Sequence, residues 1–458
     1  MTMSLSKRIA TGTLYASLST ILIRAFSLCS YILLLKKLPV HDYGVVVLIF
    51  ASVAPAWMFI FWGLDRTFVS EFGRSLGQKN FAGALKLFRE YYAFIIFMSL
   101  LFVGGTLLLR ELLQNYFPYI LEYTIQIIFF VISQVFLNMT LLFLESNSEL
   151  KKISVFESCE SLFRFAIIIG LFFFNSLNIS TVIFAYSIAK FFAGLVAVPS
   201  VIKTYVFLRT SKHYNEKFNV PVLLNVVKKF GKWDVFANFG EGLFNTIKIW
   251  AIKIFINIQA VAYYDFAQNI FGILVSLVPV RKVIYPFIAS SIKDLKTVKF
   301  IISKSRKYLL FIYIFMVAGM VFVLPLAIEY IFPAYKESIP LVLLFMIKLF
   351  LDVFSLGHAP LLSGLRKQNF KFLVQVVSLP VGIILYILFV YWFGLIGSVL
   401  SGLALVLFKV VVEQWYIEKK LHIKTWDIKS FLSFDAYDRI LIEKIKGMFL
   451  GILKRKNS

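Results

Sequence analysis

Twelve apolar stretches, each long enough to cross a bilayer, constrain this chain more than any other feature of its sequence. A helix needs about 20 apolar residues to span the hydrocarbon core of a membrane. The stretches cover residues 11–35, 43–63, 91–109, 120–142, 153–174, 181–202, 233–256, 262–284, 308–328, 339–361, 372–390 and 395–416. We therefore expect an all-α polytopic membrane protein with twelve transmembrane helices. A soluble globular protein is excluded, because only 16% of the residues are charged, whereas soluble domains average about 25%.

The distribution of basic residues predicts the orientation of the chain, because Lys and Arg concentrate in cytoplasmic loops. With the amino terminus inside, four basic residues lie in outer loops: Lys36, Lys37, Arg110 and Lys336. Seven lie within the spans: Arg24, Arg164, Lys190, Lys248, Lys253, Lys348 and Lys409. The other 37 of the 48 basic residues then lie on the cytoplasmic side. Topology thus accounts for most of the net charge of +24 without a nucleic-acid partner, and both termini are expected in the cytoplasm.

The two halves of the chain resemble each other at an offset of about 218 residues. LPVHDYGVVVLIFA, which contains Gly44, and NIQAVAYYDFAQNIFG, which contains Ala262, each open the second span of their half. With an even number of spans per half, the copies have the same orientation, as in many transporters. We predict two pseudo-symmetric six-helix lobes (1–202 and 233–416) around a central cavity, joined by a cytoplasmic linker (203–232). A basic tail (417–458) follows, with an amphipathic pattern typical of a helix on the membrane surface.

A stripe of polar residues runs along the first helix of each half. In WDVFANFGEGLFNTIKIWAIKIF, five polar residues recur at steps of three or four and therefore share one helix face. They are Asp234, Asn238, Glu241, Asn245 and Lys248. On the first span, Thr20, Arg24 and Ser27 lie on a face with the same spacing. We expect both faces to line the central cavity, because a charged side chain at mid-bilayer costs roughly 2.5–3.5 kcal/mol.

The polar groups inside the spans suggest a substrate site and an ion site. Basic groups at depth suit a phosphate or an acidic sugar, and Arg fits phosphate oxygens especially well. The cavity candidates are Arg24, Thr20, Ser27, Arg164, Lys190, Asn238, Glu241, Asn245 and Lys248. The candidates for binding a coupling proton or sodium ion are Glu157, Asp234, Glu241 and Asp352. No other cofactor is expected, because Cys29 and Cys159 lie at different predicted depths and the histidines are scattered.

Several of these charges also have a purely structural interpretation. Glu160 with Arg164, Lys348 with Asp352, and Lys409 with Glu413 are each four residues apart, and can pair along their own helices. Lys253 and Asp234 lie near span ends, where side chains reach the interface. Arg24 has no acid within one turn, and Glu241 and Lys248 are seven residues apart. A cavity role is therefore favoured for these last three residues.

Four segments, taken in order and spacing, carry a family resemblance. They are LPVHDYGVVVLI in span two, GLDRTFVSEFGRSLGQKN after it, AVAYYDFAQNI in span eight and FGLIGSVLSG entering span twelve. To about residue 416 the chain resembles the polysaccharide biosynthesis, or oligosaccharide-lipid (Wzx-like), flippases of the multidrug/oligosaccharidyl-lipid/polysaccharide exporter superfamily. The resemblance implies a bacterial inner-membrane transporter that works by alternating access. It would carry undecaprenyl-pyrophosphate-linked oligosaccharide to the periplasmic leaflet for O-antigen, capsule or exopolysaccharide.

The resemblance further implies a cationic cavity lined by the first and seventh helices, with the polyprenyl tail of the substrate in the membrane lipid. A polysaccharide polymerase or glycosyltransferases are the protein partners expected. Three alternatives stay open. A cation-coupled drug exporter of the superfamily more typically has an acid in span one, where this chain has Arg24. A lipid II flippase is expected to have two further helices, and a membrane-embedded polymerase or glycosyltransferase a large loop outside the bilayer.

Overall fold

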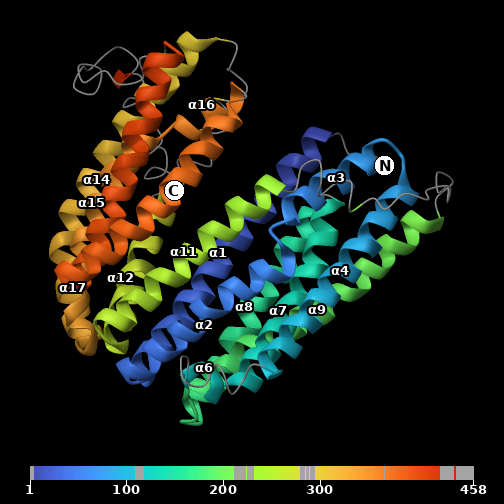
Figure 1. The fold of residues 1–458 in the computed structure, drawn as a ribbon, viewed down its shortest axis with the longest axis horizontal. Coiled ribbons are helices and arrows are strands. Elements are labelled where there is room, and N and C mark those ends of the chain that lie inside the picture. The colour runs from blue at the N-terminus through green and yellow to red at the C-terminus, as the bar shows by residue number, and fades with distance from the viewer. Residues whose placement is uncertain are drawn as a thin grey trace, which may run out of the picture. The chain divides into compact units, whose positions relative to one another are not determined.

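The computed structural model describes residues 5–108, 118–147, 149–210, 223, 232–278, 284, 288, 294–365, 367–422 and 438–439, and its ribbon is shown in Figure 1. These residues form helices and no strand, which confirms the predicted all-α class. Within them, nine helices are long and apolar enough to cross a membrane. The chain is therefore a multi-pass membrane protein.

Every predicted span overlaps helical residues of the structure, although the boundaries differ for the last three. The long helices are α1 (Leu5–Lys37), α2 (Val40–Phe61), α4 (Phe81–Leu108), α7 (Thr124–Ser146), α8 (Leu150–Phe173), α9 (Ile179–Thr210), α11 (Lys232–Phe255), α12 (Ile258–Leu277), α14 (Leu295–Ile331), α15 (Ile339–Ser355) and α17 (Gln368–Lys420). Four shorter elements join them: α3 (Asp65–Gly77), α6 (Pro118–Glu122), the 3₁₀ helix η2 (Pro333–Ser338) and α16 (His358–Gly364).

The predicted tenth span, 339–361, is wrong as a single helix. The structure breaks it between α15 and α16, where Gly357 has a φ of +92°. A Cβ at this glycine would lie 2.7 Å from the side chain of Ile302 on α14. The preceding carbonyl, that of Leu356, accepts a hydrogen bond of 3.0 Å from Arg306 Nε, also on α14. The break thus depends on contacts with a helix that is remote in the sequence.

Predicted spans eleven and twelve both lie in α17, which is divided by one residue. Gly394 has a φ of 57° and a ψ of −139° inside this 53-residue element. That conformation is open to glycine and strained for residues with a Cβ. The expected loop between the two spans is therefore reduced to a kink.

The chain divides into two compact units. Unit 1 consists of Met1–Gln268, Pro325–Leu341 and Gln375–Ser401, and unit 2 of Asn269–Leu324, Val342–Val374 and Gly402–Ser458. The boundaries of these units differ from those of the predicted lobes, 1–202 and 233–416. The boundaries of the lobes therefore stay a prediction.

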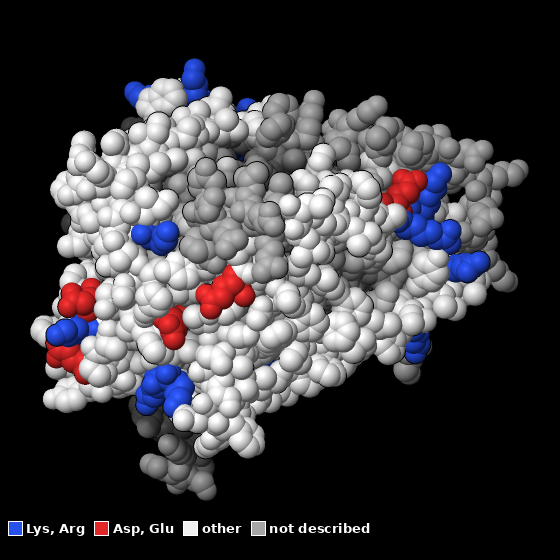
Figure 2. Space-filling view, turned by 60° about the horizontal axis from the view of Figure 1, so that its bottom comes forward, with Lys and Arg blue, Asp and Glu red and all other residues white. Residues whose placement is uncertain are grey.

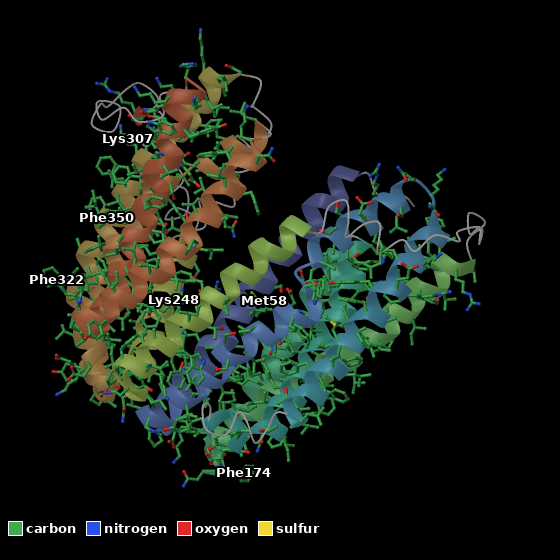
Figure 3. The ribbon with its side chains drawn as sticks, in the orientation of Figure 1. Met58, Phe174, Lys248, Lys307, Phe322 and Phe350 are labelled. Atoms are coloured by element: carbon green, nitrogen blue, oxygen red, sulfur yellow. The ribbon has the colours of Figure 1, made fainter. Side chains whose placement is uncertain are left out.

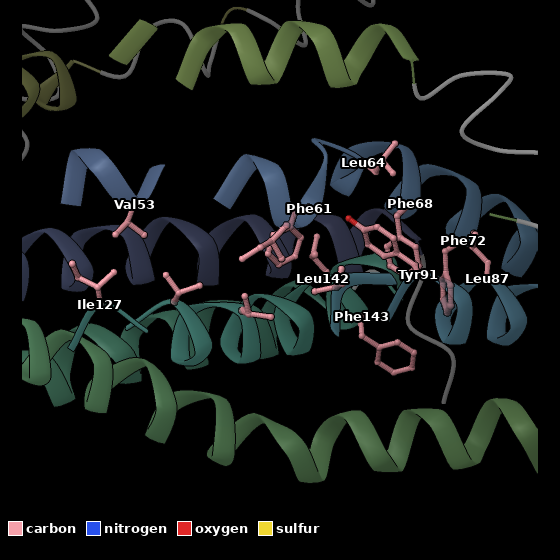
Figure 4. Packing of buried hydrophobic residues seen from close by; sticks show 14 of the residues in the cluster. Val53, Phe61, Leu64, Phe68, Phe72, Leu87, Tyr91, Ile127, Leu142 and Phe143 are labelled. Carbon is pink, nitrogen blue, oxygen red and sulfur yellow. The ribbon is translucent and has the colours of Figure 1, made fainter. Parts of the chain in front are cut away.

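An aromatic core organises one part of unit 1 (Figure 4). Phe61, Phe68, Phe72, Tyr91 and Phe143 are all buried there, and the rings of Phe68 and Tyr91 stack with their centroids 4.6 Å apart. Their burial fixes the short helix α3 against α4 and α7. This amphipathic helix was not predicted; it lies in the stretch expected to be a cytoplasmic loop.

The outer surface suits a lipid environment. On the face shown in Figure 2, most of the visible described residues are neither acidic nor basic. In unit 1 Phe174 is 82% exposed, and in unit 2 Phe322 is 75% exposed; both are labelled in Figure 3. Contact of such apolar side chains with lipid tails costs little free energy, whereas their exposure to water is unfavourable.

The repeat predicted from the sequence recurs in the helix boundaries. Three pairs of boundaries are each separated by 218 residues: the ends of α1 and α11 at Lys37 and Phe255, the starts of α2 and α12 at Val40 and Ile258, and the starts of α8 and α17 at Leu150 and Gln368. At these three boundaries the structure has the offset that the sequence predicts.

Candidate functional site

Three charged side chains gather where α8 and α9 meet in unit 1. Arg164 Nη1 lies 3.3 Å from Glu160 Oε1, and Lys190 Nζ lies 3.7 Å from the same oxygen. The side chains are only 12–13% exposed. We call Glu160, Arg164 and Lys190 the cation cluster, because one carboxylate against two cations leaves an excess positive charge.

Neighbouring side chains hold the guanidinium of Arg164 in place. Its Nη2 donates a 2.7 Å hydrogen bond to Ser27 Oγ on α1, and its central carbon lies 4.9 Å from the centroid of the Tyr186 ring on α9. Within the described part of the chain, Arg164 Nε is buried and has no hydrogen-bond partner. A buried donor left unpaired costs free energy. An oxygen of an anionic ligand beside the guanidinium would supply an acceptor.

The register of two packed helices brings Ser27 to Arg164. Helices α1 and α8 pack side by side, and Ser19 Oγ donates a 2.9 Å hydrogen bond to the carbonyl of Ser154. Further along both helices, the rings of Phe26 and Phe165 stack at 5.6 Å. Because the residue numbers of these contacts rise together along both helices, α1 and α8 run in the same direction. This register places the polar face of α1 beside the charged residues of α8.

Lys190 extends to the cation cluster from α9, the third helix that contributes to it. Helix α9 packs against both α7 and α8, and Lys190 Nζ lies 5.6 Å from the ring of Phe130 on α7. The lysine is thus placed between an aromatic face and the carboxylate of Glu160, two partners that stabilise an ammonium group. The pairing of Glu160 with Arg164 was anticipated from their spacing; the second cation on the same carboxylate was not.

The other candidates on α1 and α8 lie on exposed positions. Thr20 and Arg24 are exposed on α1, at steps of seven and three residues before Ser27, and Glu157 is exposed on α8 one turn before Glu160. These positions continue the polar faces of the two packed helices toward the cation cluster. The structure therefore brings together Ser27, Arg164 and Lys190 from the predicted cavity set.

On α11 the structure describes part of the polar stripe. Asn245 is exposed, and Lys248, labelled in Figure 3, lies with its Nζ 4.9 Å from the ring of Phe244. Asp234, Asn238 and Glu241 belong to this helix, but their side chains lie outside the described residues. Their roles stay predictions.

A different face of α11 packs against α2 within unit 1. Thr246 Oγ1 donates a 2.7 Å hydrogen bond to the carbonyl of Ala51, and Trp250 Nε1 donates one of 2.8 Å to Ser52 Oγ. Gly242 faces Met58, which is labelled in Figure 3. The first helix of the second half is therefore held against the first half by a face other than the one that carries Asn245.

Unit 2 contains a cavity of about 340 Å³. Asp352, the ion-coupling candidate, lines it together with Ser355, Lys409 and Glu413. Glu413 was expected to pair with Lys409; its Oε2 lies 3.1 Å from Nδ1 of His358, a buried residue. Acids in such a cavity suit a bound cation, and the prediction for Asp352 is retained below as a proposal.

A second polar contact in unit 1 was not anticipated. The hydroxyl of Tyr43 on α2 donates a hydrogen bond to the carboxylate of Asp265 on α12. Beside it, a Cβ at Gly44 would lie 2.4 Å from the carbonyl oxygen of Ile258. Both segments carry the sequence resemblance, but neither side chain was named. The sequence did contain a signal for this contact. Asp265 is an acid within an apolar span, and Tyr43 lies in the matching segment of the first half.

No protein-family model and no curated protein sequence matches the chain. Solved structures do. An inward-facing multidrug resistance MATE family transporter of the MOP superfamily matches with a TM-score of 0.70 and 12% identity, over 87% of this chain and 95% of that one. The lipid II flippase MurJ in an inward closed conformation matches with a TM-score of 0.70 and 15% identity, over 96% and 97%.

A MOP superfamily transporter from Pyrococcus furiosus, described as having a binding pocket of reverse polarity, matches with a TM-score of 0.60 and 11% identity, over 93% of this chain and 97% of that one. At these identities the likeness shows the fold alone. The fold is thus that of the MOP transporters, with twelve helices in two lobes, as predicted.

Proposed function

We propose that this protein is a flippase for undecaprenyl-pyrophosphate-linked oligosaccharide repeat units. It would move them from the cytoplasmic to the periplasmic leaflet of the bacterial inner membrane by alternating access, for O-antigen, capsule or exopolysaccharide synthesis. Both termini would lie in the cytoplasm. The fold shared with MOP transporters supports a transport function, and the substrate class rests on the residues below.

The observation that carries the substrate class is the excess positive charge of the cation cluster. Pyrophosphate is anionic, and its oxygens accept the hydrogen bonds that guanidinium and ammonium groups donate. Arg164 has one donor already oriented by Ser27 and another, Nε, without a partner in the described part of the chain. A ligand phosphate would compete with Glu160 for the two cations. A cationic drug would instead be repelled by them.

The transport cycle would be driven by the coupled movement of a proton or a sodium ion. Glu157, Asp234, Glu241 and Asp352 are the acids proposed to bind it, and Asp352 has the support of the cavity in unit 2. The remaining polar groups, Arg24, Thr20, Asn238, Asn245 and Lys248, would contact the phosphates and sugar hydroxyls. A polymerase or glycosyltransferases would supply or consume the lipid-linked oligosaccharide.

The first test is lipid analysis of a deletion strain. We expect undecaprenyl-pyrophosphate-linked repeat units to accumulate complete on the cytoplasmic leaflet while the surface polysaccharide disappears. Accumulation of lipid II would favour the lipid II flippase, incomplete units would favour an enzyme, and normal polysaccharide without an intermediate would favour a drug exporter. Each of these three results would overturn the proposal.

Complementation of that strain tests the cation cluster. Arg164→Gln and Lys190→Gln should lower polysaccharide export about 10-fold or more, because a hydrogen bond to a charged group contributes about 1.5–3 kcal/mol. Arg164→Lys keeps the charge but loses the planar fork, and should fall between wild type and Arg164→Gln. The matched control is Arg89→Gln on α4, which removes an exposed arginine hydrogen-bonded to Tyr205. Equal export by all variants at equal expression would exclude a role for the cluster.

A further inference from the structure

His358 is a buried histidine of unit 2 whose two ring nitrogens both face oxygen atoms. It begins α16 and is only 1% exposed. Its Nδ1 lies 3.1 Å from Glu413 Oε2, and its Nε2 lies 2.9 Å from Gln414 Oε1. Both partners are on α17, so these two contacts join α16 to α17.

The orientation of the Gln414 amide is fixed by a second acid. Its Nε2 donates a 2.6 Å hydrogen bond to Glu418 Oε1. The opposite orientation would place the amide oxygen against a carboxylate oxygen, and both of these atoms are hydrogen-bond acceptors. The amide oxygen of Gln414 therefore faces His358 as an acceptor. The hydrogen bond to Glu418 polarises the amide and strengthens that acceptor.

A neutral imidazole does not satisfy both contacts, because it has one N–H donor and one bare nitrogen. The bare nitrogen would present its lone pair to an oxygen at hydrogen-bond distance, which is repulsive. A further proton between His358 Nδ1 and Glu413 Oε2 would remove this conflict. A carboxyl group is a stronger acid than an imidazolium, so the proton belongs to the ring. The two contacting oxygens, rather than the total charge around the ring, thus determine where the proton lies.

Glu413 connects the pair to the cavity of unit 2. Its side chain is 22% exposed and lines the cavity together with Asp352 and Lys409, whereas the imidazole of His358 is buried. A proton would therefore enter and leave by way of the Glu413 carboxylate. Lys409 lies one turn before Glu413 on α17, at a spacing that suits an ion pair once the carboxylate is released from His358.

Charges of both signs surround the pair. The described residues beside it include Asp352 on α15, Lys409 and Glu418 on α17, and Arg306 on α14. The two cations oppose a positive charge on the imidazole and the two acids favour it, and Glu418 also interacts electrostatically with Arg306. The charged group in contact with the ring is the Glu413 carboxylate.

We propose that His358 and Glu413 form a proton-binding site in unit 2. With the proton bound, an imidazolium on α16 donates hydrogen bonds to Glu413 and Gln414 on α17. When the proton leaves to solvent through the cavity, a neutral imidazole with its hydrogen on Nε2 and an ionised Glu413 remain, and Glu413 turns toward Lys409. The contact between α16 and Glu413 thus depends on the proton. The site does not depend on the proposed transport function, and neither residue is among the acids proposed there.

Nitrogen NMR of the full-length protein labelled with ¹⁵N-histidine tests the site, because the ring signals distinguish an imidazolium from both neutral tautomers. The variant His358→Gln identifies which signals belong to His358. We expect both of its ring nitrogens to carry a proton at about pH 7.5, where a free imidazole is only about one-tenth protonated. A neutral His358 in the wild type at this pH would overturn the proposal, whatever the protein transports.

Two variants test the role of the carboxylate. Glu413→Gln removes the charge and keeps the size of the side chain, so His358 should have a single N–H at the same pH. Lys409→Gln is the matched control in the same cavity; it removes a cation and should leave the imidazolium in place. An imidazolium that persists in Glu413→Gln, or disappears in Lys409→Gln, would refute the site. If Glu413→Gln yields too little protein, Glu413→Asp shortens the side chain by one methylene and should lower the protonated fraction of His358; an unchanged fraction would overturn the proposal.

Thermal unfolding in detergent then tests the link between α16 and α17. Wild type, His358→Gln, Glu413→Gln and the double variant form a double-mutant cycle. Because the pair interacts when it is protonated, the loss of melting temperature in the double variant should be smaller than the sum of the two single losses at about pH 6. This difference should shrink at about pH 9, where an ordinary imidazole is neutral. Additive losses at the lower pH, or a difference that is equal at both, would overturn the dependence of this contact on the proton.

Discussion

Asp65 is an acid at the start of α3 whose surroundings favour its neutral form. Burial raises its pKa from 3.8 to about 6, and nearby Glu145 acts in the same direction, while a hydrogen bond from the Tyr91 hydroxyl opposes the change. Folded protein thus holds this proton more tightly than the unfolded chain does. The stabilising contribution is fully present below about pH 4 and is lost as the pH rises to about 6.

Replacing Asp65 by Asn should remove this part of the pH dependence. A difference of about 2 pKa units corresponds to ~3 kcal/mol, so the wild type should lose up to that amount relative to Asp65→Asn between pH 4 and pH 6.5. Asn keeps an acceptor for the Tyr91 hydroxyl, so packing is little changed. The measurement is the melting temperature of both proteins in detergent across this range. If the melting temperatures of the two proteins changed in parallel with pH, the raised pKa of Asp65 would be contradicted.

Asp294 offers a control of opposite sign. Hydrogen bonds from the side chain and backbone of Thr297 lower its pKa. Its stabilising effect is therefore present above the ordinary pKa and is lost as the pH falls through the lowered value. Asp294→Asn should lose stability relative to the wild type at neutral pH and recover part of that difference in acid.

Among the elements, α2 and α12 approach each other closely at Gly44. Because a Cβ there would lie 2.4 Å from the carbonyl oxygen of Ile258, Gly44→Ala should force the helix ends apart and cost ~1–3 kcal/mol, the usual range for overpacking. Gly105→Ala on α4 is the matched control, since a Cβ there meets nothing within 4 Å and alanine favours a helix by ~0.5–1 kcal/mol. Thermal unfolding should move in opposite directions for the two variants; a gain in stability for Gly44→Ala would contradict the close contact.

The sequence predicted where helices run better than where they break. Apolar length is a property of consecutive residues, so every span could be found, and α8 at Leu150–Phe173 lies within a few residues of the prediction at both ends. The break at Gly357 depends on Ile302 and Arg306, which reach it from α14. A stretch of apolar residues does not reveal such a partner. Helix α3 was missed although Phe68 and Phe72 recur at helical spacing, because its 13 residues are too few and too polar to form a membrane span.

The candidate site was predictable in its members and not in its assembly. Ser27, Arg164 and Lys190 were named from their polarity at membrane depth, and Glu160 from its spacing to Arg164. Arg164 and Lys190 meet at Glu160, and Ser27 meets Arg164, only because α1, α8 and α9 pack together. No pattern within a single helix contains that packing. The contact between Asp438 and α14 shows the same limit, since its carboxylate accepts a hydrogen bond from the hydroxyl of Tyr308, 130 residues earlier in the chain.

At the scale of the whole molecule, the predicted orientation can be tested by labelling single cysteines. Cys29 and Cys159 are free thiols and would first be replaced by Ser. Ser176→Cys, between α8 and α9, should react with a membrane-impermeant maleimide in intact spheroplasts. Gln78→Cys, between α3 and α4, should react only after permeabilisation; both positions are exposed. The reverse pattern would place the termini outside and contradict the predicted orientation.

The 218-residue repeat has a consequence for how a ligand would be held. The backbone boundaries recur in both halves, but the charges do not: the positions equivalent to Arg24, Arg164 and Lys190 are Gly242, Gly382 and Phe408. A molecule with true two-fold symmetry would carry every charge twice and would attract an anion equally from both sides. Here the scaffold is duplicated while these three charges are not, so the two halves would offer different side chains to a bound ligand.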